Sequence, residues 1–385
     1  MTGRAPVSIL SLDGGGSRCI LQLLLLHALE LEIRRQNDNP DLYLVDYFDL
    51  VAGTSCGGII AAMMVLPDLE HPDRPAFSMA DICTSIQQYL PMAFSNISDK
   101  GHIGILKEKY NGRSLSALLR SVFSGARLSN ALKPCLIPAY DVEANRARFF
   151  CSHDYYDQKR CAALGVLHKG KSVQDWLLRD VCRATSAAPI FFEPASIAPL
   201  AYGDGEQTQM GDPRIFIDGG VFANNPALCA YGEIRSKWQG GLGIKDMFMV
   251  SLGTGISPLP LESGGYIRAW KGGVKLVNFL FAEATQAIHM GLEQIFSLEY
   301  AHRYHRFNWD IDEMLSLDDV SDASIENMYR TFTGLQIPPR FLGQSAWIDM
   351  GAEAARWLPP HLRTQVENVA QGLRMCRELR LEQYE

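Results

Sequence analysis

Ser55 stands in the pentapeptide GTSCG, residues 53–57, whose spacing indicates nucleophilic catalysis. A GxSxG turn between a strand and a helix places its serine on a sharp bend, with the hydroxyl exposed above the N-terminus of the helix. The pentapeptide also fits a simple packing turn. Its flanks favour catalysis, because a strand-like run at 47–52 precedes it and an apolar helical run at 59–66 follows. We therefore predict that Ser55 is the nucleophile of a serine acyl hydrolase.

A glycine loop of sequence DGGGSR, residues 13–18, lies between a strand-like run at 7–12 and a leucine-rich helical run at 20–35. Backbone without side chains can approach a ligand closely and turn its N–H groups toward negative charge. Attack on an acyl carbon needs such donors for the oxyanion, so the loop is a candidate oxyanion hole. A nucleotide-phosphate loop is the alternative, but the Gly-Lys-Ser/Thr ending is missing and Cys19 replaces the last glycine of GxGxxG. Arg18 orients this loop, meets a lipid phosphate or forms a salt bridge at the helix start.

Asp218 is the candidate base for the serine proton. It follows the apolar run at 214–217 and precedes two glycines, a place at the carboxyl end of a strand where α/β enzymes gather catalytic groups. The same pattern is common in plain turns. Most of the nine histidines lack a flanking motif, so a histidine base has little support in the sequence. A Ser-His-Asp triad stays open through three histidines of the last third, namely His289, His302 and His305.

The composition and the N-terminal sequence argue against several classes of protein. A net charge of -7 argues against non-specific electrostatic binding of a nucleic-acid polymer. Nine cysteines without CxxC pairs or close Cys/His clusters fit reduced thiols, so we expect no structural metal and no cofactor. The N-terminus lacks the pattern of a secretion signal, which predicts a cytoplasmic protein. The uncharged run at 50–67 contains the Ser55 turn and is predicted to be buried rather than to span a membrane.

Strand-like and helical runs alternate along the first two thirds, which predicts an α/β fold. Further strands are expected at 133–140, 148–151, 214–217 and 247–252. After Gly255 the sequence predicts mainly helix, at 266–300 and 352–385, around an aromatic and charged stretch at 304–310. We expect a core domain over residues 7–255 and a helical region over 256–385 that completes or regulates it.

Taken together, the motifs resemble those of the patatin-like phospholipases. The resemblance rests on four blocks in the family's order: DGGGSR at 13–18, GTSCGG at 53–58, ATSAAP at 184–189, and DGGV at 218–221 continuing to NNP at 224–226. The segment SLGTG at 251–255 resembles a further block of the family. It implies a three-layer α/β/α sandwich with a mostly parallel central sheet and a helical C-terminal part. Cys19 departs from the family, whose loop usually closes with another glycine.

The resemblance also implies site residues. Ser55 would act with Asp218 as a dyad that needs no histidine or metal, and the oxyanion hole would use the amides of Gly14, Gly15 and Gly16 beside Arg18. The implied reaction is hydrolysis of fatty-acyl esters by a phospholipase A or lysophospholipase. An acyl chain needs an apolar channel, for which the candidates, also explained by core packing, are Met92, Phe94, Phe191 and Phe192.

The resemblance further implies partners. A lipid ester substrate requires transient contact with a membrane surface from the cytoplasm. The layout is similar to bacterial patatin-like phospholipases that cyclic nucleotides activate in anti-phage (antiviral) defence, which implies a cyclic-nucleotide activator and a C-terminal third that bears a sensor or a homo-oligomer surface. The non-enzymatic alternative is an inactive binding or scaffold protein that keeps the fold.

Overall fold

The computed structural model describes residues 5–95, 108–168, 174–202, 208–256, 273–297, 299–311, 315–334 and 358–384. His102 and part of the expected helices at 266–300 and 352–385 lie outside these ranges.

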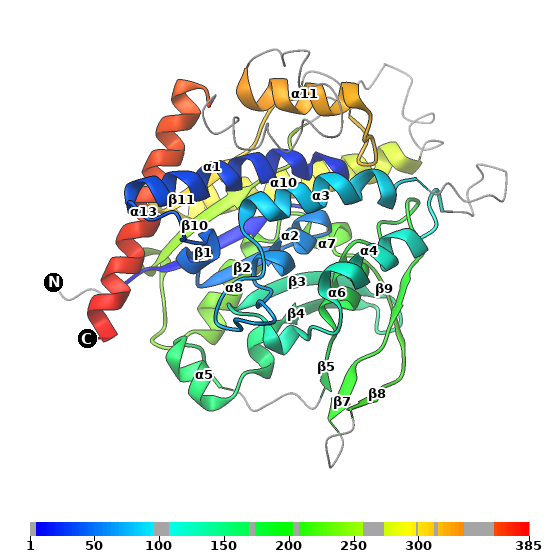
Figure 1. Ribbon diagram of the computed structural model, residues 1–385, viewed down its shortest axis with the longest axis horizontal. Helices are drawn as coiled ribbons and strands as arrows, with labels where there is room; N and C mark the ends of the chain where they lie inside the picture. The colour runs from blue at the N-terminus through cyan, green and yellow to red at the C-terminus, as the bar shows by residue number, and fades with distance from the viewer. Residues whose placement is uncertain are drawn as a thin grey trace.

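An eight-stranded sheet forms the middle layer (Figure 1). Its strands are β1 (Val7–Leu12), β2 (Leu50–Gly53), β3 (Cys135–Asp141), β4 (Arg146–Cys151), β6 (Ala195–Ile197), β9 (Arg214–Asp218), β10 (Met247–Leu252) and β11 (Tyr304–Phe307). The order is β11-β10-β1-β2-β3-β9-β6, with β4 paired to β3. Strands β11 to β3 along this order are parallel, whereas β4, β9 and β6 join antiparallel. This confirms the predicted mostly parallel sheet.

Helices cover both faces of this sheet and confirm the predicted three layers (Figure 1). They are α1 (Ile20–Gln36), α2 (Cys56–Met64), α3 (Met79–Ala93), α4 (Arg113–Phe123), α5 (Gln158–Ala163), α6 (Leu178–Thr185), α7 (Gly220–Ala223), α8 (Ala227–Lys237), α10 (Gly273–Ile295), α11 (Asp322–Thr333) and α13 (Pro360–Tyr384). Short 3-10 turns are η1 (Gly16–Cys19), η2 (Leu44–Tyr47), η3 (Leu128–Asn130), η4 (Ser152–Tyr155), η5 (Ile244–Asp246) and η6 (Ala301–Arg303). A separate small sheet joins β5 (Gln174–Asp175), β7 (Leu200–Tyr202) and β8 (Thr208–Met210).

The alternation of side chains along β1 divides the interior into two cores. Leu10 and Leu12 face a core shared with α1, α2, α3 and α13, whereas Val7 and Ile9 face a core shared with α8 and α10. Successive side chains of a strand point to opposite faces, so an apolar strand such as VSILSL can be buried on both sides. This burial fits the position of β1 as an interior strand of the sheet, between β10 and β2 and directly before the glycine loop.

Two late elements belong to the same layered body. β11 extends the main sheet beside β10, although the stretch that contains it was not predicted as a strand. α13 packs against α1, and its buried side chains Val369 and Leu373 are part of the same core as Leu10. In addition, Arg374 of α13 donates to the carbonyl of Gln36 at the end of α1.

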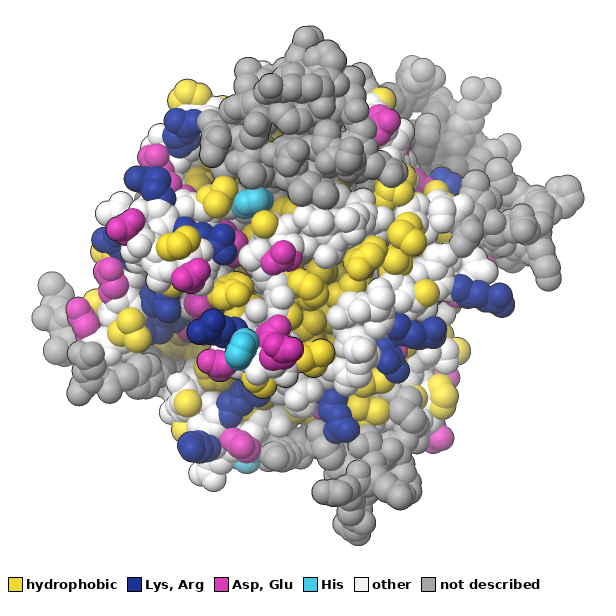
Figure 2. Space-filling model, viewed as in Figure 1, with side chains coloured by type: hydrophobic (Ala, Val, Ile, Leu, Met, Phe, Trp, Pro, Cys, Tyr) yellow, Lys and Arg dark blue, Asp and Glu magenta, His cyan; other side chains and the backbone are white. Residues whose placement is uncertain are grey.

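The surface carries charges of both signs. On the face shown in Figure 2, Lys and Arg side chains are interspersed with Asp and Glu, and hydrophobic side chains gather near its middle. Among the helices that the structure describes, none combines the length and the apolar character that a bilayer span requires.

The buried face of α13 gives a stability prediction. Leu373→Ala removes a fully buried side chain, so we expect it to lower the free energy of unfolding by about 2–5 kcal/mol in one cooperative urea transition. Leu381→Ala, on the same helix but 59% exposed, is the matched control and should change it by less than about 0.5 kcal/mol. An unchanged Leu373→Ala protein, or a separate early transition, would show that α13 is not part of this core.

Candidate active site

Ser55 occupies the turn from β2 into α2 in a strained conformation. Its backbone has φ 55° and ψ −126°, outside the regions that L residues favour. Glycines make the bend sterically accessible: a Cβ on Gly53 would lie 2.2 Å from the carbonyl oxygen of Gly57, and one on Gly57 would lie 2.6 Å from that of Leu12. The GxSxG spacing is thus required by close backbone contacts, as in the sharp strand-to-helix turn expected from sequence.

The Ser55 hydroxyl donates to Asp218. Ser55 Oγ lies 2.7 Å from Asp218 Oδ2, and the other carboxylate oxygen, Oδ1, accepts from the N–H of Gly220 at 2.7 Å. Asp218 ends β9 and is fully buried, whereas Ser55 keeps 9% of its surface exposed. The structure therefore brings together the two residues that the sequence analysis selected as nucleophile and base.

Burial raises the pKa of Asp218 to about 7, although the hydrogen bonds from Gly220 and Ser55 oppose this shift. A carboxylate in a low-dielectric interior loses its hydration, so its neutral form is favoured. A pKa near neutral pH is the range in which a carboxyl group can accept and return a proton.

Thr185 fixes the backbone of the nucleophile. Its hydroxyl accepts from the Ser55 N–H at 3.0 Å and donates to the carbonyl of Pro138 at 2.6 Å, so the turn is tied to β3. The Ser55 N–H is consequently already engaged in a hydrogen bond. Sequence reasoning quoted the block that contains Thr185 but gave this residue no role, because its two partners are 130 and 47 residues away along the chain.

The glycine loop passes beside Ser55, and its three glycines differ. The N–H of Gly14 already donates to the carbonyl of Asn224 at 2.9 Å, so the expected oxyanion donor at Gly14 is not available in this structure. Gly15 and Gly16 both line the cavity above Ser55. Within the described residues, neither of their N–H groups has a hydrogen-bond acceptor.

Asn224 and Thr254 hold this loop from its other side. The carbonyl oxygen of Gly14 accepts from Thr254 Oγ1 at 3.0 Å and from Asn224 Nδ2 at 3.3 Å. Asn224 Nδ2 also reaches Thr285 Oγ1 of α10 at 2.9 Å. Both residues stand in blocks that the sequence analysis noted, at 224–226 and 251–255, without assigning a function to them.

A buried ion pair anchors the start of the loop. Arg306 of β11 donates to both carboxylate oxygens of Asp13, at 3.0 and 2.6 Å, and also to Ser251 Oγ. Gln22 of α1 donates to the carbonyls of Asp13 and Leu252. Bidentate pairing of this kind restricts the geometry as well as adding energy. The N–H of Asp13 also donates to the carbonyl of Leu252 in β10 at 3.0 Å, so three elements, β11, α1 and β10, position the first residue of the loop.

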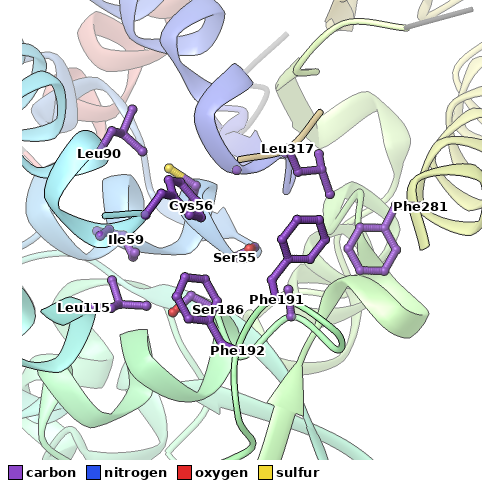
Figure 3. Close-up of a pocket in the computed structure, with 15 residues that line it drawn as sticks. Ser55, Cys56, Ile59, Leu90, Leu115, Ser186, Phe191, Phe192, Phe281 and Leu317 are labelled. Carbon is purple, nitrogen blue, oxygen red and sulfur yellow. The ribbon is translucent and has the colours of Figure 1, made fainter. Parts of the chain in front are cut away.

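An apolar cavity of about 580 Å³, including space open to solvent, lies above Ser55 (Figure 3). Its hydrophobic lining comes from Cys56, Ile59, Leu90, Ala93, Phe94, Leu115, Ala188, Phe191, Phe192, Phe281 and Leu317. Three of the four residues predicted for an acyl channel are in this set. The fourth, Met92, is 53% exposed and is not part of the lining. A cavity with this lining can hold an alkyl chain, since few polar groups compete for it.

Arg18 is not among the residues that line the cavity of Ser55. It lines a second cavity, together with Asp13, Asn224 and Thr254, on the side of the loop that these residues hold. Arg18, expected beside the oxyanion hole, thus lies in the turn η1 and lines a different cavity from Gly15 and Gly16.

The described histidines lie elsewhere. None of them lines the cavity of Ser55. His289 instead contacts the hydroxyl of Tyr304, and His305 contacts the carbonyl of His302. The alternative of a Ser-His-Asp triad therefore has no support among the described residues.

One group of potential metal ligands was not visible in the sequence. Cys151, His153 and Glu233 place their ligand atoms within 4.8 Å of one another. Lys237 Nζ lies 2.7 Å from Glu233 and 2.8 Å from Asp154, so the carboxylate already has a cationic partner. Burial would raise the pKa of Glu233, but His153 and Lys237 lower it to about 2. We interpret the group as a structural polar network.

Comparison with known proteins decides the family. The model of the patatin-like phospholipase family matches residues 10–231, which include Ser55, Asp218 and the glycine loop. The chain belongs to the patatin-like phospholipase family. Its fold agrees with the α/β sandwich expected for this family.

Several similar relatives are plant proteins. Patatin-like protein 2 of Oryza sativa subsp. indica is 34% identical over 59% of this chain and 53% of its own length. "Probable inactive patatin-like protein 9" of Arabidopsis thaliana is 29% identical over 68% of this chain and 63% of its own length. A solved structure, human GIVD cytosolic phospholipase A2, has a TM-score of 0.42 and 11% identity, covering 98% of this chain and 63% of that one. The chain thus spans about half the length of the first curated relative that it matches.

The buried carboxyl group of Asp218 makes stability depend on pH. Its folded-state pKa of about 7 exceeds the value of about 4 for an unfolded aspartate, so its stabilising contribution is complete below about pH 4 and is lost as the pH rises to about 7. Asp218→Asn keeps the shape but does not titrate. We therefore expect the variant to gain stability over the wild type between pH 4 and 7, by up to about 1.4 kcal/mol per pH unit, and the difference to stay constant above pH 7.

Urea unfolding across this pH range measures the difference. Asp73→Asn, at an exposed carboxylate, is the control and should give a nearly constant difference. A stability difference for Asp218→Asn that does not change between pH 4 and 7 would contradict the raised pKa.

Proposed function

We propose that this patatin-like protein is a serine lipid acyl hydrolase of the phospholipase A or lysophospholipase type. The observation that carries the proposal is the 2.7 Å hydrogen bond from Ser55 Oγ to Asp218 at the base of the apolar cavity. A base within hydrogen-bonding distance of the serine proton is the arrangement that nucleophilic catalysis needs. The carboxyl group has the proton affinity for this role, and the cavity has the apolar lining that an acyl chain needs.

In the proposed reaction, Asp218 accepts the Ser55 proton while Ser55 Oγ forms a bond to the ester carbon. The N–H groups of Gly15 and Gly16 are the proposed donors to the oxyanion, since both glycines line the cavity and their amides have no acceptor among the described residues. The ester C–O bond then breaks, and the proton passes from Asp218 to the leaving alcohol. In the second half of the reaction, water attacks the acyl carbon and gives a proton to Asp218. The bond between the acyl group and Ser55 Oγ then breaks, the proton returns to Ser55, and the fatty acid is released.

A catalytically inactive scaffold is the competing function. One similar relative carries the name "Probable inactive patatin-like protein 9", so membership of the family does not by itself establish activity. Retention of Ser55, its strained turn and the hydrogen bond to Asp218 favours the hydrolase, because strain of this kind persists where function uses it.

Contact with a membrane surface is proposed for the mouth of the cavity. Ile190, next to the lining residue Phe191, has φ 77° and is 39% exposed, and Met92, next to the lining residue Ala93, is 53% exposed. A positive φ is costly for a β-branched residue. Exposed apolar side chains adjacent in sequence to lining residues fit an enzyme that takes its substrate from a lipid surface on the cytoplasmic side. A cyclic-nucleotide activator, a homo-oligomer and a role in anti-phage defence remain predictions from the family resemblance.

The nucleophile can be tested by covalent labelling. We expect a fluorophosphonate probe to modify Ser55, because the proposed base activates this hydroxyl, and mass spectrometry of the labelled peptide identifies the site. Ser55→Ala should lose the label and at least about 10³-fold of the rate of fatty-acid release from phosphatidylcholine and lysophosphatidylcholine. Ser121→Ala, at an exposed serine of α4 outside the cavity, is the control and should keep both. Full turnover by a folded Ser55→Ala protein would contradict the assignment of Ser55 as the nucleophile.

The proposed base also predicts a pH dependence. Since only the ionised carboxyl group can accept a proton, kcat/KM for a soluble ester should rise up to tenfold per pH unit toward about pH 7 and then level off. The ionisation of a carboxyl group depends little on temperature, whereas that of imidazole depends strongly on it. The pH at the midpoint of the rise in kcat/KM should therefore change little on cooling. A midpoint that moves markedly to higher pH on cooling would indicate a histidine base instead.

A further inference from the structure

The second cavity, on the other side of the glycine loop from Ser55, contains an unpaired cation. It has a volume of about 320 Å³, including space open to solvent, and Arg18 is part of its lining. Arg18 is only 8% exposed, and its buried Nε has no hydrogen-bond partner. In the described part of the chain, no carboxylate forms a salt bridge with its guanidinium group. A buried charge without a partner is costly, so a ligand that neutralises it would be bound favourably.

The other groups of this cavity also favour an anion. Its one acidic lining residue, Asp13, is neutralised by the two hydrogen bonds from Arg306. The amide of Asn308 accepts from Gly255 N through Oδ1, which leaves its nitrogen as a donor, and Gln286 adds a second amide. Thr285 accepts from Asn224, so its hydroxyl proton remains for another acceptor. Arg18 thus lies beside amide and hydroxyl donors, together with one buried acceptor that has no hydrogen-bond partner, Asn224 Oδ1.

We propose that this cavity is a binding site for a phosphate-bearing anion, with Arg18 as its principal ligand. Phosphate oxygens match the fork of N–H donors that a guanidinium group presents, and amide and hydroxyl donors complete such a site. The glycine loop separates the site from the ester-binding cavity, and the proposal is independent of the proposed hydrolysis. Asn224 and Thr254, which line the site, also hold the carbonyl of Gly14, so a bound anion braces the residues that hold this loop.

Binding is tested on the purified protein by calorimetric titration and thermal unfolding at constant ionic strength. We expect inorganic phosphate to bind and to raise the Tm of the wild type, because a ligand that binds only the folded state stabilises it. Arg18→Gln should weaken binding at least about tenfold and abolish the Tm shift. Arg120→Gln, at an exposed arginine of α4, is the matched control and should respond like the wild type.

Two further measurements separate a ligand site from a structural role. Without phosphate, Arg18→Gln should be at least as stable as the wild type, since it removes a buried unpaired charge; a structural arginine would give a lower Tm. Ala282→Leu, on α10, fills the cavity but keeps the charge, and should also abolish the phosphate response. Absence of phosphate binding by the wild type, or equal binding by Arg18→Gln, overturns the proposal.

The source of the phosphate is resolved by a second probe, sn-glycero-3-phosphocholine. Binding of this diester as well as inorganic phosphate assigns the site to lipid head groups. Binding of inorganic phosphate alone assigns it to a free phosphate or a phosphate monoester in solution. Either result supports an anion site at Arg18, provided that Arg18→Gln abolishes it.

Discussion

The hydrogen bond between Ser55 and Asp218 joins residues that are 163 positions apart, and strand β3 determines whether they can meet. β3 pairs with β2, which leads into the Ser55 turn, and with β9, which ends at Asp218. The carbonyl of Pro138 in β3 accepts a hydrogen bond from the hydroxyl of Thr185, and this hydroxyl in turn accepts from the Ser55 N–H. A one-residue slip in either pairing would turn the side chains to the other face and separate the pair. The register of β3 is therefore the constraint on which the site depends.

The surroundings of Asp218 leave its carboxyl group without a cationic partner among the described residues. Asp218 is fully buried, and its carboxyl group accepts hydrogen bonds from one amide and one hydroxyl. An arginine beside it would stabilise the ionised form and lower its proton affinity. The fold instead places a well-paired arginine, Arg306, at Asp13, the residue that begins the glycine loop.

Local patterns were sufficient to predict the α/β class and to select Ser55, Asp218 and the glycine loop as candidates, and the structure brings these candidates together. Each of these depends on a short segment: an apolar strand, a turn with glycines, and the start of a helix. Thr185, Asn224 and Arg306 could not be assigned roles from sequence, because each acts through partners distant in the chain. The engaged amide of Gly14 and the separate cavity of Arg18 have the same cause, since both follow from how η1 and the segment around Asn224 pack. β11 was missed because four residues of mixed character carry too weak a pattern.

The position of Arg306 late in the chain has a consequence during synthesis. A nascent chain that has emerged as far as residue 255 contains Ser55, Asp218 and all three glycines of the loop. It lacks β11, and with it the guanidinium group that holds Asp13. The loop beside the nucleophile can therefore acquire this anchor only after β11 has left the ribosome, later than Ser55, Asp218 and the loop itself.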